Sequence, residues 1–312
     1  MVKAQHEFVE AYETHDGVEM DSTETELCKC TWVQILNETG EEAMGKPVGN
    51  YLTIESDILE HGRHGVLEEV AQTVSEYLLK MMNIPDNASV LVVGIGNRNV
   101  LADSLGVRVA DKVWATRQLV DEAYNKYGRN LRPVSVISPG VMGVTGISTA
   151  EIIKSISGEI KPSLVILIDA LAARRTSRLG SCIQISDTGL TPSGGLLDNQ
   201  KRQTINSDFL GVPVVCVGIP TVINSATIIA DAMNMFVNNH EGAENENDND
   251  MLNAEFLENI QHFADTMFAS SSPFVTTKEI DTVIQYSAYV ISTAINAALF
   301  QDDWMQTPYG SY

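Results

Sequence analysis

The stretch LVILI at residues 164–168, followed at once by Asp169, decides the fold class of this chain. An uninterrupted run of branched apolar side chains is typical of a strand buried on both faces, as in a parallel sheet covered by helices. Similar runs occur at residues 89–94 (SVLVVG) and 212–217 (VPVVCV). Together these runs predict the central strands of a parallel sheet.

Helices are expected between and around these strands. Apolar residues recur at helical spacing over 66–82, and Ser148 with Glu151 three residues later forms a capping box that begins another helix. Further helices are expected over residues 105–127, about 224–237, and from a second capping box at 276–279 to about residue 300.

Shorter strands complete the pattern. Residues 133–137 predict one strand, and the alternating residues 182–185 predict an outer or edge strand. Strands alternating with helices predict the α/β class, with a mainly parallel sheet and helices on both faces.

The two ends of the chain differ from this centre. Residues 26–55 contain two short β-like runs and predict an N-terminal β appendage, while the last helix is expected to return to the sheet. Residues 1–25 lack apolar periodicity and predict a leader, and residues 238–254 predict a flexible acidic insertion. We therefore expect one α/β domain over residues 26–312.

Composition excludes several classes of function. The formal net charge of −21 argues against direct binding to nucleic acid or to an anionic membrane. We expect no apolar run long enough to span a bilayer, and the polar first residues are unlike a secretory signal, so a cytoplasmic protein is predicted. The four cysteines have no metal-binding spacing and are expected to be reduced thiols.

Two aspartates follow predicted buried strands. Asp169 comes directly after LVILI, and Asp103 lies shortly after the run at residues 89–94. Because ligands bind outside the carboxyl ends of parallel strands, both carboxyl groups are expected at one rim of the sheet. Two adjacent carboxyl groups do not both ionise easily, so the pair would supply a base and an acid for peptide hydrolysis.

Each aspartate also has a structural interpretation. Asp169 would cap the following turn or pair with Arg174, and Asp103 would cap the helix expected from Leu105. For Asp103 taken alone, the structural interpretation is favoured; the convergence of two carboxyl groups is what favours chemistry.

Other residues at the same rim are candidates for binding substrate or stabilising an oxyanion. Backbone N–H groups of glycine-rich loops suit the second role, and polar side chains would support the aspartates. These candidates are Gly94, Gly96, Asn97, Gly140, Gly146 and Arg174.

Several familiar motifs are incomplete here. Gly94 and Gly96 form two thirds of a dinucleotide-binding fingerprint, but Asn99 occupies the third glycine position. The triplet DTG at residues 187–189 occurs once in an α/β pattern, so it predicts a turn with Gly189 in a left-handed conformation. No histidine is placed for a catalytic triad or a zinc site, and no metal or cofactor is expected.

Six blocks of sequence, in matching order and spacing, resemble the spore germination protease family. They are VVGIGN at 92–97, RPVS at 132–135, PGVMGVTG at 139–146, IDALAAR at 168–174, QISDTG at 184–189 and GIPTV at 218–222. Residues 45–56, 275–281 and 296–299 resemble the family as well.

The resemblance implies an atypical aspartic endopeptidase of the forespore or spore core. Members degrade small acid-soluble spore proteins during germination and are made as homotetrameric, self-processing zymogens. Their two aspartates match Asp103 and Asp169, which the position of the strands also selects. The implied fold is phosphorylase/hydrolase-like and related to hydrogenase-maturation endopeptidases.

The segment around Asp103 departs from the family. Residues 101–107 read LADSLGV, where the family has TPDALGP, and this segment is closer to the nickel-binding maturation endopeptidases. Ser104 stands where those enzymes carry a further acidic residue, which makes a metal site doubtful. A nickel-linked maturation endopeptidase and a non-catalytic spore binding protein of the same fold therefore remain as alternatives.

The leader departs too. The family's self-cleavage sequence TDLA is missing, and EFVE at residues 7–10 resembles it only faintly. We place a hypothetical self-cleavage between Glu7 and Phe8.

Overall fold

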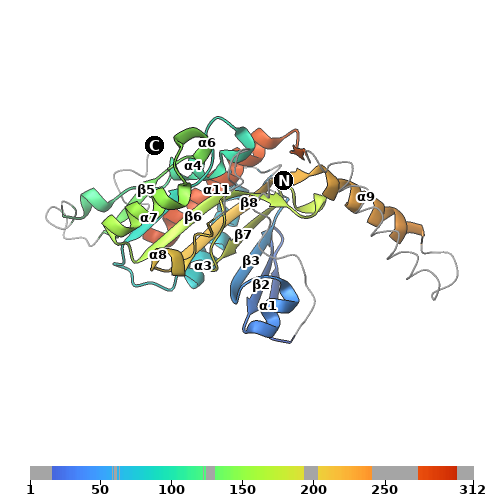
Figure 1. Cartoon of the computed structure of the whole chain (residues 1–312), viewed down its shortest axis with the longest axis horizontal. Coiled ribbons are helices and arrows are strands. Elements are labelled where there is room, and N and C mark those ends of the chain that lie inside the picture. The colour runs from blue at the N-terminus through green and yellow to red at the C-terminus, as the bar shows by residue number, and fades with distance from the viewer. Residues whose placement is uncertain are drawn as a thin grey trace.

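The computed structural model describes residues 16–57, 59, 62, 64–121, 123, 131–192, 203–240 and 273–300. The strands in these ranges form one mixed sheet in the order β1-β2-β3-β7-β8-β6-β4-β5, and β9 pairs with β8 (Figure 1). Their bounds are β1 Val18–Glu24, β2 Lys29–Ile35, β3 Gly49–Glu55, β4 Val90–Gly94, β5 Val134–Ile137, β6 Leu164–Ala173, β7 Cys182–Ser186, β8 Val214–Asn224 and β9 Phe274–Val275.

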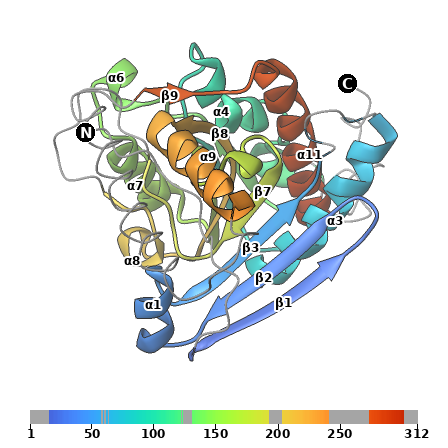
Figure 2. The same ribbon diagram turned by 90° about the vertical axis from the view of Figure 1, so that its right-hand side faces the viewer.

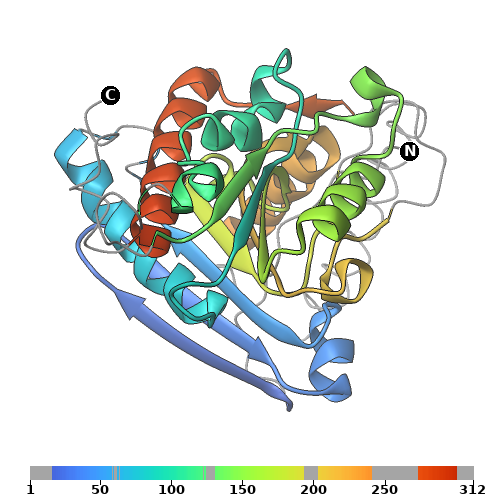
Figure 3. The ribbon, with the colours of Figure 1, turned by 90° about the vertical axis from the view of Figure 1, so that its left-hand side faces the viewer.

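Helices cover both faces of the sheet, with α11 and α7 on opposite sides of the strands (Figures 2 and 3). The α-helices are α1 Glu38–Met44, α3 His64–Met82, α4 Leu105–Ala110, α6 Met142–Thr145, α7 Thr149–Ile160, α8 Ser207–Leu210, α9 Ser225–His240 and α11 Ile280–Phe300. Three short 3-10 turns are η1 Leu101–Asp103, η2 Arg117–Leu119 and η3 Thr176–Arg178. The predicted α/β class is confirmed.

Parallel pairing is confined to one half of the sheet. Strands β5, β4, β6 and β8 are parallel neighbours. The remaining pairs, including β7 with β8 and β3 with β7, are antiparallel. The sheet is therefore mixed rather than mainly parallel, and the predicted N-terminal β appendage is continuous with the sheet through β3.

Strand β7 corrects another expectation, because it lies between β3 and β8 in the interior instead of at an edge. The alternation of polar and apolar residues in CIQIS suggested an exposed face. Gln184 is nevertheless buried, as is Ser186. A buried polar row on one face of the sheet produced the misleading pattern.

Strand β1 lies within the predicted leader and is ordered by pairing along its full length with β2. Its side chains are mostly exposed, so the segment shows no apolar periodicity. The strand is stabilised by the backbone ladder, which residue composition does not reveal. Of the predicted acidic insertion, residues 238–240 end α9, and residues 241–254 lie outside the described residues.

Strands β6 and β8 are longer than expected, and α4 is shorter. Strand β6 continues through Asp169 to Ala173, and β8 continues to Asn224. The helix expected over residues 105–127 ends at Ala110. The chain then turns so that the Thr116 hydroxyl accepts from the Val134 N–H at the edge of β5, at 3.0 Å.

Only part of the predicted capping is present. Ser148 precedes α7, but its side chain makes no capping hydrogen bond. Ahead of α11, the Glu279 N–H donates to the hydroxyl of Thr277 at 2.9 Å, rather than to that of Thr276.

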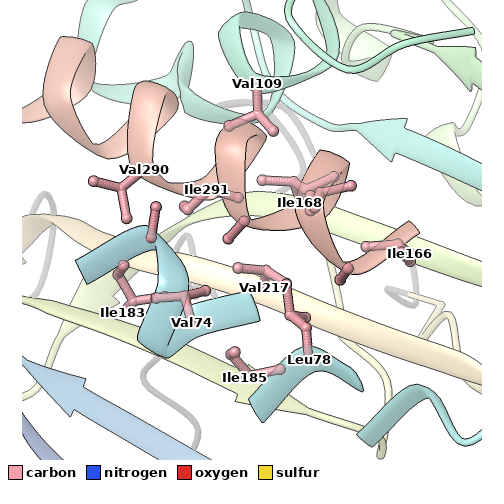
Figure 4. Packing of buried hydrophobic residues seen from close by; sticks show 14 of the residues in the cluster. Val74, Leu78, Val109, Ile166, Ile168, Ile183, Ile185, Val217, Val290 and Ile291 are labelled. Carbon is pink, nitrogen blue, oxygen red and sulfur yellow. The ribbon is translucent and has the colours of Figure 1, made fainter. Parts of the chain in front are cut away.

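The larger part of the core lies between the sheet and helices α3, α4 and α11, as Figure 4 shows. Val74 and Leu78 of α3 face Ile183 and Ile185 of β7, with Ile291 of α11 beside them. A second cluster packs on the opposite face, under α7 and α8.

Helix α11 is apolar enough, by length and composition, to cross a membrane, but most of it is buried inside the protein. Its packing against α3 and α4 makes it a core helix of the domain.

Candidate active site

Asp169 is the first residue of β6 beyond the end of its neighbour β4. The last register pair of these strands is Gly94 with Ile168, and the Ile95 N–H donates to the Ile168 carbonyl at 2.8 Å. The strand itself does not end at Asp169, because β6 still pairs with β8 there, opposite Gly218. The sequence predicted that β6 ends just before Asp169. In the structure it is the neighbouring strand β4 that ends there, while β6 continues.

The carboxyl group of Asp169 is enclosed. Its residue is 1% exposed. One oxygen, Oδ1, accepts from the Ala170 N–H at 2.8 Å, while the buried Oδ2 has no hydrogen-bond partner among the described residues. A buried carboxyl oxygen without a partner strongly disfavours the charged form. The geometry also argues against an ion pair between Oδ2 and Arg174.

Asp103 ends the turn η1, which lies against β6 and β8. The Asn97 N–H donates to its side-chain Oδ2 at 2.9 Å and to its backbone carbonyl at 3.0 Å. Asp103 is half-buried. It is Ser104, and not Asp103, that stands at the N-cap position of α4, so the capping interpretation of Asp103 fails.

Glycines allow the turn and the following helix to approach the strand ends closely. Gly96 has φ +131°, and a Cβ there would overlap the Asp103 carbonyl oxygen. A Cβ on Gly94 would overlap the Gly106 carbonyl, and one on Gly106 would overlap the carbonyls of Ile95 and Ile168. Gly94 and Gly96 thus shape the site through their lack of a side chain.

Burial acts on both carboxyl groups, and the charge of Asp103 acts on Asp169. Burial raises the pKa of Asp103 to about 6, against the lowering effect of the Asn97 N–H. The pKa of Asp169 is raised well above its ordinary value, first by burial and second by the negative charge of Asp103, with the Ala170 N–H acting the other way.

These shifts set the order of ionisation. Asp103 loses its proton first, and its charge then holds the proton on Asp169. Asp169 is still neutral at that stage, so it places no charge beside Asp103. Once Asp103 is ionised, burial and the charge of Asp103 both favour the protonated form of Asp169, and a carboxylate beside a carboxylic acid suits acid–base catalysis.

The remaining predicted residues divide into near and distant groups. Asn97 lies at the site through its backbone N–H, and its side chain accepts from the Asn99 N–H at 3.0 Å. Gly140 precedes α6 with φ +76°, and Gly146 ends that helix with φ +72°, both in the loop that follows β5. This loop follows β5, which is separated from β6 by β4, whereas the loop with Gly96 follows β4 itself, the strand next to β6.

Arg174 is not brought to the pair. It follows β6 five residues after Asp169, which corresponds to roughly 16 Å along an extended strand. Ser104 is buried, and its hydroxyl donates to the Leu101 carbonyl at 2.7 Å and accepts from Arg108 Nε at 3.1 Å.

The triplet at residues 187–189 forms the predicted turn, with φ +93° at Gly189. Asp187 accepts two hydrogen bonds from Asn50, from the backbone N–H at 2.8 Å and from the side-chain amide at 2.7 Å. These bonds give Asp187 a structural role that joins β3 to the end of β7.

Sequence reasoning did not identify two buried polar residues near the site. Gln184 of β7 pairs in register with Gly218, which pairs on its other side with Asp169. Thr221 of β8 is fully buried, and its hydroxyl donates to the Ala102 carbonyl at 2.7 Å. Their position in the motifs at 184–189 and 218–222 was the available signal.

Glu7 and Phe8, the hypothetical self-cleavage site, lie outside the described residues. Within the described ranges, no group of three or more His, Cys, Asp or Glu residues could hold a metal ion.

The chain is similar to known germination proteases over most of its length. A family model described as "Germination protease" matches residues 1–267. The chain is 41% identical over 290 residues to the germination protease of Caldanaerobacter subterraneus subsp. tengcongensis, covering 91% of this chain and 88% of that one. It is 40% identical to the germination protease of Clostridium perfringens strain ATCC 13124, with the same coverage.

A further relative is the germination protease of Priestia megaterium, 41% identical over 231 residues, which cover 73% of this chain and 61% of that one. Among solved structures, a [NiFe] hydrogenase maturation protease, HycI from Thermococcus kodakarensis KOD1, matches 61% of this chain and 96% of its own at 15% identity. The TM-score of 0.30 is too low for that likeness to support an argument.

Proposed function

The chain belongs to the germination protease family and is thus a protease of spore germination; from this premise we propose that it is an endopeptidase whose catalytic groups are Asp103 and Asp169. The observation that carries the proposal is the buried carboxyl group of Asp169 at the point where β4 ends, with the turn that carries Asp103 packed against the same strand. We further propose that the substrates are small acid-soluble spore proteins, as in the family resemblance.

The two aspartates have different roles in this proposal. Asp103 is the base, because it ionises first and is the more exposed of the two. It takes a proton from a water molecule whose oxygen attacks the scissile carbonyl carbon. Asp169 is the acid: it gives its proton to the peptide nitrogen as the C–N bond breaks. A proton transfer from Asp103 to Asp169 then restores the starting state.

The tetrahedral intermediate needs hydrogen-bond donors. Backbone N–H groups of the loop at Gly94 and Gly96, or of the loop at Gly140 and Gly146, are proposed for this role. The loop after β4 is favoured, because a Cβ on Gly96 would lie 3.8 Å from the Asp103 Cγ atom.

The wider biology is proposed from the resemblance. The protein is made in the forespore as a homotetrameric zymogen, acts in the spore core, and removes its own leader, with Glu7 and Phe8 flanking the cut. Mass spectrometry of protein from sporulating cells tests this: a persistent Met1 terminus in active protein contradicts the cleavage.

Digestion of a purified small acid-soluble spore protein tests the main proposal. Wild-type protein is expected to cut it, and Asp103→Asn and Asp169→Asn proteins are expected to leave it intact while keeping their circular dichroism spectra. Circular dichroism separates loss of catalysis from loss of folding. Retained cutting by either folded variant contradicts the pair of aspartates.

The same assay addresses the alternatives. A nickel-linked maturation endopeptidase would contain nickel after purification, which elemental analysis detects, and would cut a hydrogenase precursor. A non-catalytic binding protein would retain the spore protein without cutting it. Cutting that persists in the presence of a chelator, together with loss of cutting in both Asn variants, favours the aspartate mechanism over both.

A further inference from the structure

Strand β8 carries one residue more than its partner β6. The register runs from Leu171 opposite Pro220 to Ala172 opposite Val222, which leaves Thr221 outside the ladder. Such β-bulges redirect a side chain and are common beside active sites. The bulge lies beyond Asp169, on the part of β6 that β4 does not cover.

At the bulge, the side chain of Thr221 contacts the turn η1. It is fully buried, and its hydroxyl donates to the Ala102 carbonyl at 2.7 Å. Ala102 is the residue directly before Asp103 in the turn. The bond therefore joins the sheet to the backbone that carries the more exposed of the two carboxyl groups.

The other hydrogen bonds described for the turn are local. The Asp103 N–H donates to Val100, and Ser104 donates to Leu101 through its N–H and its hydroxyl. The Asn97 bonds to Asp103 come from the same loop. These bonds fix the shape of the loop after β4, whereas the Thr221 bond ties the turn directly to strand β8.

Thr221 is itself held on both sides. The Thr276 hydroxyl donates to the Thr221 carbonyl at 2.6 Å, and the Gly180 N–H donates to the Pro220 carbonyl at 2.7 Å. Thr276 lies between β9 and α11. The bulge is thus a fixed support from which a hydroxyl group can position the turn.

We propose that Thr221 is a positioning residue, whose bulge-directed hydroxyl holds the η1 turn so that the Asp103 carboxyl group faces Asp169. The inference rests on the proposed function, since it assigns to Thr221 a role in presenting the proposed base. It predicts that the hydroxyl matters for the rate of the chemical step and for the environment of Asp103, more than for binding substrate.

The experiment compares Thr221→Val, which keeps the shape but loses the hydroxyl, with Thr221→Ser, which keeps the hydroxyl. The kcat and KM for cutting a small acid-soluble spore protein are measured across pH. Thr221→Val is expected to lower kcat about 10-fold to 100-fold, with KM changed less than about 3-fold, the range seen for loss of precise positioning. Thr221→Ser is expected to keep kcat within about 3-fold.

The pH dependence separates positioning from general stability. If Asp103 is the base, kcat of the wild-type protein should rise as Asp103 ionises, at about pH 6. A loosened turn lets water reach Asp103, so this rise should move to lower pH in Thr221→Val. A folded Thr221→Val protein with unchanged kcat and unchanged pH dependence overturns the proposal. So does an equal loss in Thr221→Ser, because the hydroxyl is then not the active feature.

A second measurement keeps the test independent of catalysis. The Asp103 carboxyl group is titrated by 13C NMR in an Asp169→Asn background, with and without Thr221→Val. A lower Asp103 pKa in the Thr221→Val protein supports positioning even if Asp103→Asn retains activity, which would contradict only the proposed function. An unchanged pKa overturns the positioning role while leaving the aspartate pair untouched.

If Thr221→Val does not fold, Thr276→Val supplies the test. It removes the support behind Thr221 but leaves the Thr221 hydroxyl in place. The same shift of the Asp103 titration, at smaller size, is expected. If the Asp103 pKa is unchanged in folded Thr276→Val protein, the positioning role of Thr221 is overturned.

Discussion

The two halves of the sheet differ in strand direction, and the proposed catalytic residues lie in only one of them. In the parallel half, β5, β4, β6 and β8 all end at one edge, so the loops that follow them converge. In the antiparallel half, β7, β3, β2 and β1 send successive loops to opposite edges. Asp169 and Thr221 lie in strands of the parallel half, and Asp103 lies in the turn after β4. The antiparallel half adds buried apolar residues to the core.

The largest expected effect tests the parallel half directly. Asp169→Asn and Asp103→Asn should each lower kcat by at least about 10³-fold, because one loses the acid and the other the base. Initial rates of cutting, followed by gel electrophoresis, measure this. Asp187→Asn is the matched control from the end of β7 and should keep kcat within about 3-fold if its circular dichroism spectrum is unchanged.

Shortening one buried side chain in each half of the sheet tests the difference between the halves. Ile54→Ala, at a fully buried position of β3, should lower the free energy of unfolding by about 2–5 kcal/mol and leave kcat of the folded protein unchanged. Ile168→Ala, equally buried but adjacent to Asp169, should lose similar stability and also lose kcat. Urea unfolding and kcat are measured in the same buffer for both variants. Equal losses of kcat in Ile54→Ala and Ile168→Ala would contradict the difference between the two halves of the sheet.

The buried carboxyl groups should also make stability depend on pH. A carboxyl group whose folded pKa is raised binds its proton more tightly when folded, so stability is greatest at low pH and falls as pH rises from about 3.8 to about 6 for Asp103. Asp103→Asn should remove this fall and raise the free energy of unfolding by about 1–3 kcal/mol at neutral pH. Urea midpoints at pH 4.5 and pH 7.5 test it; a gain at pH 4.5 as large as that at pH 7.5 contradicts it.

The smallest effect is expected at the outer edge of the antiparallel half. Met20 of β1 is 38% exposed, so Met20→Ala should change the free energy of unfolding by less than about 0.5 kcal/mol. Activity should not change. A measurable loss of kcat in folded Met20→Ala protein would show that the antiparallel half influences the proposed active site.

The sequence was most informative where the pattern is local and apolar. The runs at residues 89–94 and 164–168 predicted β4 and β6, and the negative charge of Asp103 raises the pKa of Asp169. Their catalytic roles stay predictions. Burial of both faces forces branched apolar residues into these strands, which is why the signal is visible without any knowledge of the fold.

The sequence was least informative where long-range pairing decides. Residues 170–173 read ALAA, which favours a helix, yet β8 pairs with them as strand. Gln184 suggested an exposed face because a single sequence does not show which polar residues are buried together. The Thr221 bulge depends on the register between two strands, and register is a property of the assembled sheet.

The early end of β4 has a consequence for how this protein can be altered. Strand β4 stops at Gly94 while its neighbour β6 continues to Ala173, and the turn η1, which carries Asp103, lies against β6. The number of residues between Gly94 and Asp103 therefore decides where this turn can sit on β6. Engineering aimed at new substrates should accordingly vary side chains and leave that number unchanged.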